Sequence, residues 1–416
     1  MNEQLQSRRN FLSLASGYAL SAVFPAWAQG EKSGFPVRAI TKGPGFHWFG
    51  YYDKLQFDPS SRFALGMRVS IEHRSPKPED AIQIGMVDLQ DKDNWINLGT
   101  SKAWCWQQGC MLQWLPGSAK EILWNDRQEG EFVCHVLDVK TGKKRTLPHP
   151  IYAVSPDGKT AIAADFRRLH DTRPGYGYAG VPDPSLELAP KDSGIFSVDL
   201  QTGTQKLLFS MAQLAAFGEL SPSMKGAKHW FNHLLFNTDG SRFVFLHRWK
   251  PAEGKVSFKT RMVTARADGS DLFVLDPSGE TSHFIWRDPN HILAWTKPEG
   301  KGAGFYLFKD KTAEVLQVGA GIMTKNGHCS YIPGNDWILN DTYPDRERLQ
   351  HPYLFHLPTG KNLPLGRFLS PKEYAGEWRC DTHPRFSPDG NLVCIDSPHE
   401  GKGRQLYLID ISGRKA

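Results

Sequence analysis

The sequence predicts an all-β fold, a seven-bladed β-propeller with four antiparallel strands in each blade. Glycine, proline and aromatic residues are frequent, 12% of the chain being Phe, Trp or Tyr, and stretches with helical periodicity are rare. Seven similar hairpins, with turns of Gly, Asp, Asn and Pro, follow one another along the chain. A further two-strand signal follows each hairpin, so each unit supplies the strands of one blade. Two β-sandwiches would not explain seven similar units.

Residues 1–28 match a twin-arginine signal peptide and are set apart from the fold. The run SRRNFL at 7–12 fits the twin-arginine export pattern, and the apolar stretch that follows is too short to span a bilayer. An A-x-A-like cleavage site ends at Ala28. We therefore expect a propeller over 29–416 that is exported to the periplasm or secreted, with no membrane span after signal removal.

The last four hairpins share a histidine three residues before an aromatic residue. The pairs are His233 and Phe236, His283 and Trp286, His328 and Tyr331, and His383 and Phe386. Because the inner strand of every blade begins at the same face of the ring, this spacing places all four imidazoles around the mouth of one funnel. A single strand histidine is usually structural, but histidine is costly to bury unless it has a partner. We therefore interpret the set of four as functional.

The first three hairpins break this pattern. Lys54, Met111 and Ile151 take the place of the histidine, and Tyr51, Tyr52, Gln108 and Tyr152 lie close by in the sequence. The funnel is therefore expected to have imidazoles on one side, and phenols and an amide on the other. The ends of the second strands add polar residues to its mouth, among them Arg127, Arg168, Arg248 and Asp341.

The unit between Tyr152 and His233 is the longest. It contains RRLHDTRPGYGYAG at 167–180 and a run with helical character, MAQLAAF, at 211–217. A long loop of this kind at a top face is typical of an insertion that covers a substrate. Aromatic rings stack on sugars and arginine binds a carboxylate through two hydrogen bonds, which predicts an acidic sugar as ligand. Residues 36–41 are expected to supply the fourth strand of the last blade and close the ring.

These residue types suit two reactions. In β-elimination, Arg or a metal neutralises a uronate carboxylate, a His or Tyr removes the C5 proton, and a neighbour protonates the leaving oxygen. In metal-dependent hydrolysis, three imidazoles hold a divalent ion and leave a position for water. Hydrolysis by paired carboxylates fits less well, and no G-x-S-x-G motif supports a serine hydrolase.

The units with their His, aromatic and S-P-D-G residues resemble the propeller polysaccharide lyases: oligogalacturonate lyases, ulvan lyases and rhamnose–glucuronate lyases. The resemblance to the first of these families implies that histidines of the late blades and a glutamine hold a divalent metal that binds the uronate, while a separate His with an Arg carries out the chemistry. The metal expected here is Mn, Ca or Zn. The resemblance to the other two families implies a catalytic Tyr and Arg on the two strands of one hairpin, which Tyr152 and Arg168 match. The upstream histidine of those enzymes has a counterpart here only in Gln108, which leaves the identity of the acid open.

We therefore expect an exported polysaccharide lyase that cleaves uronic-acid-containing glycans by β-elimination in the funnel. The expected catalytic residues are Tyr152, His233, Arg168 and Arg248; the substrate-binding residues are Gln108, Arg127, Arg173, Tyr176 and Tyr178; and the metal ligands are His283, His328 and His383. The alternatives are a TolB-like propeller that binds protein or glycan without catalysis, and a metal-dependent hydrolase.

The partners expected from composition are an anionic oligo- or polysaccharide and no nucleic acid. The net charge of +6 is mild, and the chain lacks the clustered Lys and Arg runs of nucleic-acid-binding proteins. The six cysteines form no C-x-x-C pair and several lie in apolar strand patterns, which favours buried thiols. We expect a monomer.

Overall fold

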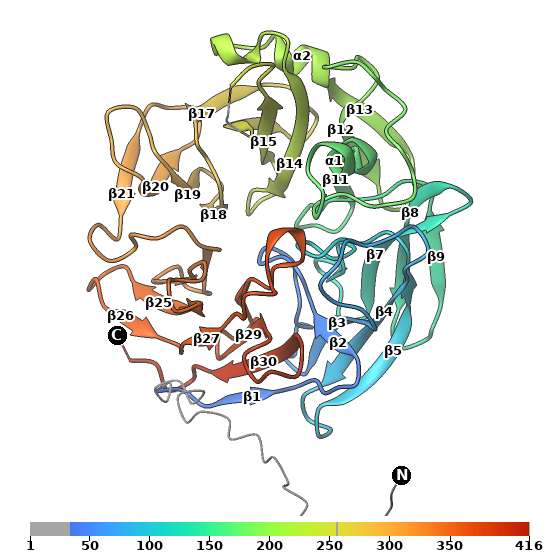
Figure 1. Cartoon of the computed structure of the whole chain (residues 1–416), viewed down its shortest axis with the longest axis vertical. Coiled ribbons are helices and arrows are strands. Elements are labelled where there is room, and N and C mark those ends of the chain that lie inside the picture. Colours follow the sequence, from blue (N-terminus) through green and yellow to red (C-terminus); the bar gives the residue numbers. More distant parts are fainter. Residues whose placement is uncertain (1–33, 255–256, 416) are drawn as a thin grey trace, which may run out of the picture.

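The computed structural model describes residues 34–254 and 257–415, which form a seven-bladed β-propeller (Figure 1). Seven four-stranded antiparallel sheets surround one centre, and the chain passes around the ring in sequence order. The signal peptide expected at residues 1–28 lies outside the described residues. None of the helices in the described part of the chain has the length and apolar character needed to cross a bilayer.

The strands of the first four blades follow the chain from the centre outward. Blade 1 contains β2 (Phe46–Trp48), β3 (Phe63–Val69), β4 (Ile82–Asp88) and β5 (Asn94–Ser101). Blade 2 contains β6 (Gln113–Trp114), β7 (Glu121–Gln128), β8 (Glu131–Asp138) and β9 (Lys144–Leu147). Blade 3 contains β10 (Ala153–Val154), β11 (Thr160–Ala164), β12 (Gly194–Asp199) and β13 (Gln205–Ser210). Blade 4 contains β14 (Lys228–Phe236), β15 (Arg242–Lys250), β16 (Lys259–Arg266) and β17 (Phe273–Gly279).

The remaining blades have shorter strands and one extra ladder. Blade 5 contains β18 (Phe284–Asp288), β19 (His291–Thr296), β20 (Gly304–Lys309) and β21 (Val315–Val318). Blade 6 contains β22 (Ser330–Tyr331), β23 (Trp337–Asn340), β25 (Tyr353–His356) and β26 (Asn362–Pro364), with β24 (Leu349–Gln350) paired to β27 (Phe368–Leu369) beside it. The short helices are α1 (Phe166–Thr172), α2 (Met211–Ala215), η2 (Pro222–Met224) and η3 (Gly376–Trp378).

Blade 7 joins the two ends of the propeller. It contains β28 (Arg385–Phe386), β29 (Leu392–Ser397), β30 (Gln405–Asp410) and, from the N-terminal part of the chain, β1 (Val37–Ala39). The β1 strand runs antiparallel to β30, with Val37 opposite Ile409. The prediction that residues 36–41 close the ring is confirmed.

The Asp-Gly pairs that mark the hairpins have a specific role in the turns. Gly158 and Gly390 both have a φ of 70°, a left-handed conformation that favours glycine. The carboxylates of Asp157 and Asp389 accept the backbone N–H groups two residues further on. This turn chemistry reverses the chain between the first and second strands of these blades, so it explains why the hairpins were visible in the sequence.

The hydrophobic core lies between neighbouring blades. One cluster joins Leu123 of blade 2, Ala163 of blade 3 and Phe245 of blade 4. Another joins Leu65 of blade 1 to Leu408 of blade 7, so the core continues across the closing seam. All six cysteines are buried free thiols, as expected.

The inner strand of blade 1 is interrupted, which the sequence did not indicate. The strand β2 ends at Trp48, and the predicted strand around Phe57 is reduced to an isolated bridge to Ala64. The segment between them brings Tyr51 and Tyr52 against the histidines of other blades. The interruption therefore delivers two phenols to the centre.

The longest unit contains both α-helices, α1 and α2. The predicted helix at 211–217 is confirmed as α2, which begins with a capping box between Ser210 and Gln213. Arg168 lies on α1 and not on the second strand of a hairpin, because β11 ends at Ala164 and Asp165 caps the helix by accepting the N–H of Arg167. The hairpin pairing of Tyr152 with Arg168 is therefore corrected.

Candidate active site

Four histidines from blades 4 to 7 meet at the centre of the ring. His233 lies within β14, and His283, His328 and His383 lie just before the inner strands of their blades. The ring centroids are 6.2 Å apart for His233 and His283, 4.2 Å for His283 and His328, and 4.2 Å for His328 and His383. All four side chains are buried. The structure thus brings together the imidazoles that the repeat places in register.

Two of these histidines have a left-handed backbone. The φ angle is 52° at His233 and 38° at His383, a region that costs a residue other than glycine about 1 kcal/mol or more. Met111, at the equivalent place in blade 2, has a φ of 57°. The same bend thus occurs at this position in blades 2, 4 and 7, and in blades 4 and 7 the sequence places an imidazole on it.

Hydrogen bonds at Nδ1 fix the orientation of two of the rings. Nδ1 of His328 donates to Asp341, 2.9 Å away, and the same carboxylate accepts the hydroxyl of Thr382. Nδ1 of His283 donates to Asn326 Oδ1 over 2.9 Å. With the proton on Nδ1, each ring directs an Nε2 lone pair away from its partner, an arrangement typical of metal-binding histidines.

Several atoms at the centre suit a divalent metal. Nε2 of His328 and Nε2 of His383 are buried and have no hydrogen-bond partner among residues 34–254 and 257–415. His328, Asp381 and His383 each offer a ligand atom, and these atoms lie within 4.8 Å of one another. Burial lowers the pKa of His283 and His383 well below the ordinary value, so both imidazoles are neutral at pH 7. Neutral imidazoles and a carboxylate therefore form a ligand set that fits such an ion.

His233 forms a pair with Tyr51. The Tyr51 hydroxyl lies 3.2 Å from His233 Nε2, the two rings stack with centroids 4.9 Å apart, and Gln108 Nε2 lies 3.3 Å from His233 Nδ1. Burial lowers the pKa of His233 and raises the pKa of Tyr51. At pH 7 the imidazole is therefore neutral and the phenol keeps its proton. Because the Tyr51 ring also contacts His383 at 5.2 Å, the pair adjoins the candidate metal ligands.

Tyr152, an expected catalytic residue, lies beneath this pair. Its hydroxyl lies 2.9 Å from Gln108 Oε1 and 3.0 Å from Asn232 Oδ1, and it accepts the backbone N–H of His233 over 2.9 Å. Burial raises the pKa of Tyr152. With its hydrogen-bonding capacity occupied by the protein, Tyr152 is better suited to position His233 than to transfer a proton to substrate.

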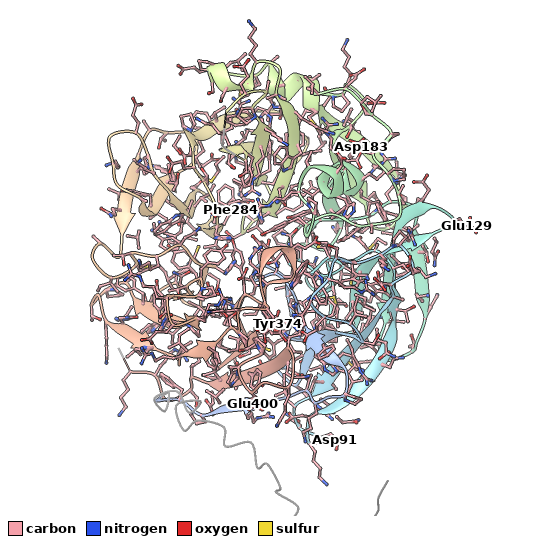
Figure 2. All side chains as sticks on the ribbon, in the orientation of Figure 1. Asp91, Glu129, Asp183, Phe284, Tyr374 and Glu400 are labelled. Atoms are coloured by element: carbon pink, nitrogen blue, oxygen red, sulfur yellow. The ribbon has the colours of Figure 1, made fainter. Side chains whose placement is uncertain are left out.

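Arg168 is buried and forms hydrogen bonds with groups of the protein. Its Nε donates to the carbonyl of His229 over 2.7 Å, and its Nη1 donates to Asp183 over 3.1 Å. Nη2 donates to the carbonyls of Glu187 and Leu188. Asp183 is labelled beside α1 in Figure 2. Because every nitrogen of Arg168 has an internal acceptor, its expected role in catalysis is replaced by a structural one, the anchoring of the insertion to blade 4.

Arg127 and Tyr178, expected to bind substrate, also make structural contacts. Arg127 donates to the carbonyls of Ala179 and Pro78. The Tyr178 hydroxyl accepts from Asn125 Nδ2 over 3.0 Å, and its ring stacks on Phe166 at 4.3 Å. These contacts hold the insertion against blade 2.

Arg173, Tyr176 and Arg379 form a cover over the histidines. The guanidinium of Arg173 lies 4.2 Å from the centroid of the Tyr176 ring, which contacts His233 at 5.6 Å. Arg379 donates to the Tyr176 hydroxyl over 2.8 Å and to Asp381 over 2.7 Å. The insertion and the loop before blade 7 are thus connected above the site, and Figure 1 shows α1 and the orange-red loop reaching toward the centre.

Arg248, on β15, lies near Arg173 of this cover, because both guanidinium groups lie against the Phe258 ring. It is buried, and its guanidinium carbon lies 4.9 Å from the centroid of Phe258. Its Nε and Nη1 have no hydrogen-bond partner within the described ranges. Of the arginines expected at the funnel, Arg173 and Arg248 thus keep donors that could meet a substrate.

Asp381, Arg379 and Asn326 of the site were missed by the sequence prediction, and Tyr51 was placed near the funnel without an assigned role. Asp381 precedes His383 by two positions, and residues two apart share a side of an extended chain, so this spacing could have indicated it. Arg379 and Asn326 come from loops that hold no position in the repeat, so no signal marked them.

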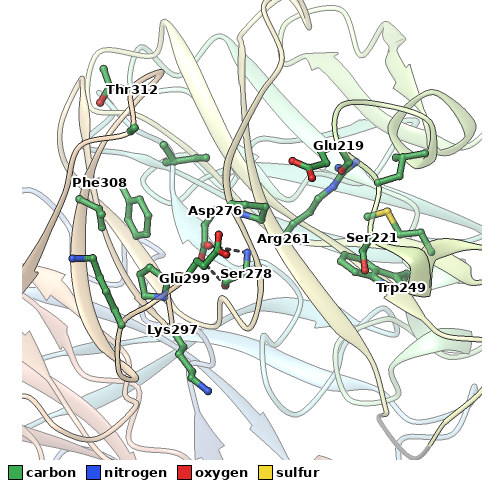
Figure 3. Close-up of a pocket in the computed structure, with 18 of the residues that line it drawn as sticks. Glu219, Ser221, Trp249, Arg261, Asp276, Ser278, Lys297, Glu299, Phe308 and Thr312 are labelled. Carbon is green, nitrogen blue, oxygen red and sulfur yellow. Dashed lines mark hydrogen bonds between the residues drawn. The ribbon is translucent and has the colours of Figure 1, made fainter.

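A different cavity, of about 700 Å³, lies between blades 4 and 5, away from the histidines (Figure 3). Its buried Asp276 accepts hydrogen bonds from Ser278, Thr281 and Thr296. Arg261 in the same wall donates to carbonyls of the neighbouring loop. The buried charged groups of this cavity are satisfied internally, so we place no chemistry there.

Comparison with known proteins identifies the architecture. No protein-family model matches the chain, and no curated protein matches it in sequence. An oligogalacturonate lyase in complex with manganese aligns with a TM-score of 0.64 and 16% identity, over 92% of this chain and 95% of the other. An oligogalacturonate lyase from Vibrio parahaemolyticus aligns with a TM-score of 0.65 and 14% identity, over 93% and 96%. The β-propeller domain of the Trilobed protease from Pyrococcus furiosus aligns with a TM-score of 0.51 and 10% identity, over 89% and 97%. The likeness shows the fold.

Proposed function

We propose that this protein is a lyase that cleaves uronic-acid-containing glycans by β-elimination at the centre of the propeller. The observation that carries the proposal is a buried set of metal-ligating groups, His328, Asp381 and His383, directly beside the Tyr51–His233 pair. The fold shared with an oligogalacturonate lyase that binds manganese adds support.

The residues around the metal-binding group would hold the carboxylate of the sugar that is cleaved. His283, His328, His383 and Asp381 would hold a divalent ion, which when bound supplies a Lewis acid that lowers the pKa of the C5 proton. Arg379, hydrogen-bonded to Asp381 and Tyr176, adds a fixed positive charge at the same mouth. The burial of these groups excludes water and strengthens their attraction for an anion.

The Tyr51–His233 pair supplies the two proton transfers. One member of the pair takes the proton from C5, the electrons of the C5–H bond form the C4–C5 double bond, and the C4–O bond breaks. The other member gives a proton to the leaving oxygen. Gln108 and Tyr152 keep His233 in place through its Nδ1 and its backbone N–H.

An absorbance assay tests this proposal. The purified protein is incubated with polygalacturonate, ulvan and gum-arabic-type glycans, and the ultraviolet band of the 4,5-unsaturated uronate is followed with added Mn²⁺ and with chelator. We expect a rise for at least one glycan in the presence of Mn²⁺. No rise with any uronate glycan, with or without the ion, would contradict the proposal.

Substitution of Tyr51 tests the assigned chemistry. Tyr51→Phe removes one hydroxyl and should lower kcat by about 10²- to 10⁴-fold, the range for a general acid or base. Tyr306→Phe is the matched control, because Tyr306 is also buried and donates one hydrogen bond, over 2.8 Å, to Gly302 in blade 5. Equal kcat values for the two variants would remove Tyr51 from the reaction.

A metal-dependent hydrolase is the second candidate, because imidazoles and a carboxylate are also the ligands of hydrolytic metal sites. The products distinguish the two. Hydrolysis releases new reducing ends without ultraviolet absorbance, whereas elimination gives one unsaturated end for each bond broken.

We also propose export through the twin-arginine route, from the pattern at residues 7–12. The mature protein should reach the periplasm in a host with the twin-arginine translocase, and the precursor should remain in the cytoplasm when Arg8 and Arg9 are both replaced by Lys. Export of that double variant at the normal level would exclude this route.

A further inference from the structure

Arg248 differs from the other buried arginines within the described residues. Arg168 and Arg385 donate to Asp183 and Asp396, Arg404 donates to Glu72, and Arg261 donates to the carbonyl of Leu214. Arg248 is 3% exposed, and its Nε and Nη1 have no acceptor in the described parts of the chain. Burying guanidinium N–H groups without an acceptor costs free energy, so the presence of a charged Arg248 here is not explained by the stability of the fold.

Two more residues with unpaired donors, Arg173 and Trp230, lie around Phe258, the ring that Arg248 contacts. The guanidinium carbons of Arg173 and Arg248 lie 4.7 Å and 4.9 Å from the centroid of Phe258, and the Trp230 ring contacts Phe258 at 5.9 Å. Trp230 is also the cross-strand partner of Arg248. Nη1 of Arg173 and Nε1 of Trp230 are buried and unpaired within the described ranges. The group therefore presents four unpaired N–H donor atoms.

The neighbouring carboxylates are already engaged. Asp171 pairs with Lys228, and Asp183 pairs with Arg168. In the part of the chain that the structure describes, neither Arg173 nor Arg248 forms a salt bridge. The group thus carries two positive charges that the surrounding protein does not neutralise.

We propose that Trp230, Arg173 and Arg248 form a second oxyanion pocket, which binds an acidic group on the sugar next to the one that is cleaved. A carboxylate or a sulfate ester supplies two or more oxygens for these donors, and arginine binds such groups through paired hydrogen bonds. Arg173 stacks on both Phe258 and Tyr176, and Tyr176 contacts His233, so the pocket adjoins the Tyr51–His233 pair. The identity of the sugar rests on the proposed function, whereas the pocket takes an oxyanion whether or not the protein is a lyase.

Thermal unfolding in sulfate tests the pocket directly. The full mature chain is heated in sodium sulfate and in sodium chloride of equal ionic strength. Sulfate at about 100 times its Kd should raise Tm by about 3 °C. Arg248→Gln should abolish this shift, and Arg266→Gln, a 65%-exposed arginine on the same blade, should keep it. No shift in the wild-type chain, or the same shift in Arg248→Gln, would overturn the pocket.

The stability of the variant separates a binding role from a structural one. Because Arg248 has unsatisfied donors, Arg248→Gln in chloride should have a Tm equal to or above that of the wild type. A structural arginine would lower it. Trp230→Phe serves as the second variant, since it keeps an aromatic ring and removes only the N–H, and it should weaken sulfate binding several-fold.

Two model substrates identify the source of the anion. With a uronate whose neighbouring sugar is acidic, Arg248→Gln should raise KM about 10- to 100-fold, the effect of losing a charged hydrogen bond. With a neutral neighbouring sugar, KM should not change. A sulfate shift that Arg248→Gln removes, together with an unchanged KM for both substrates, would assign the pocket to a free anion and overturn the sugar assignment. A sulfate shift without cleavage of any glycan would keep the pocket and reject the lyase.

Discussion

The two sides of the funnel use buried polar groups differently. On the early-blade side, Gln108 and Tyr152 form hydrogen bonds with one another and with His233. On the late-blade side, Nε2 of His328 and Nε2 of His383 are unpaired within the described chain. Both sides are buried to a similar degree. The difference shows that register in the repeat selects which residues meet at the centre, while hydrogen bonding decides which of them are available to a ligand.

The largest effect is expected from His328→Ala, which removes one of the candidate metal ligands on the late-blade side. The variant should lose divalent-metal binding by more than about 100-fold and lose elimination activity with it, because a ligand lone pair is removed. Metal content after dialysis and the ultraviolet assay measure the two effects. His291→Ala, a surface histidine paired with Asp288, is the control. Unchanged metal content in His328→Ala would mean that the free Nε2 atoms serve another purpose.

Asp341→Asn should have the next largest effect. Asp341 fixes the proton of His328 on Nδ1, and loss of such an outer partner typically costs 10- to 100-fold in metal affinity. Asp345→Asn is a matched control, since Asp345 forms a similar contact of 2.8 Å with His351 at the surface. Titration with Mn²⁺ measures both. Equal Mn²⁺ affinities of the two variants would show that Asp341 serves only to accept the backbone N–H of His328.

Acid should distinguish the two sides. Burial lowers the pKa of His233, His283 and His383, so these imidazoles are neutral when folded and take up protons on unfolding below about pH 6.5. The metal-free protein should therefore be most stable above pH 6.5 and lose stability as the pH falls, by up to about 1.4 kcal/mol per pH unit for each histidine.

The phenols respond at the opposite end of the pH range. Burial raises the pKa of Tyr51 and Tyr152, so their contribution is present below about pH 10 and is lost only as the pH rises further. Tm in chelator, measured from pH 5 to above about pH 10, tests both parts of this contrast. A flat profile between pH 7.5 and 5 would contradict the neutral, desolvated state of the imidazoles.

The smallest effect is expected from Tyr152→Phe, on the early-blade side. Removal of a hydroxyl that bonds only to the protein should cost about 1 kcal/mol of stability and reduce kcat by less than about 10-fold. Denaturant unfolding and the ultraviolet assay measure these. A loss of kcat as large as that of Tyr51→Phe would restore Tyr152 as a catalytic residue and erase the contrast between the two sides.

The sequence was sufficient for the repeat and for the histidines. Turns with Asp-Gly pairs and the spacing between His and the aromatic residue are local features, so they could be recognised without the fold, and the closing strand at 36–41 followed from the strand missing in blade 7. The four imidazoles then met because equivalent positions of a closed ring face one centre.

The tertiary structure alone decided what each polar group does. Arg168 and Arg248 are both buried arginines that the sequence places near the end of a second strand. Arg168 donates to Asp183 and three carbonyls, whereas Nε and Nη1 of Arg248 have no acceptor among the described residues. Tyr51 replaced Tyr152 beside His233 because the inner strand of blade 1 breaks after Trp48. Whether a donor or acceptor of a side chain remains unpaired depends on residues that are distant in the chain, so no local sequence pattern predicts it. Sequence by itself therefore determined the ring and the register of its histidines, and packing between blades determined which buried polar atoms remain without a hydrogen-bond partner in the described chain.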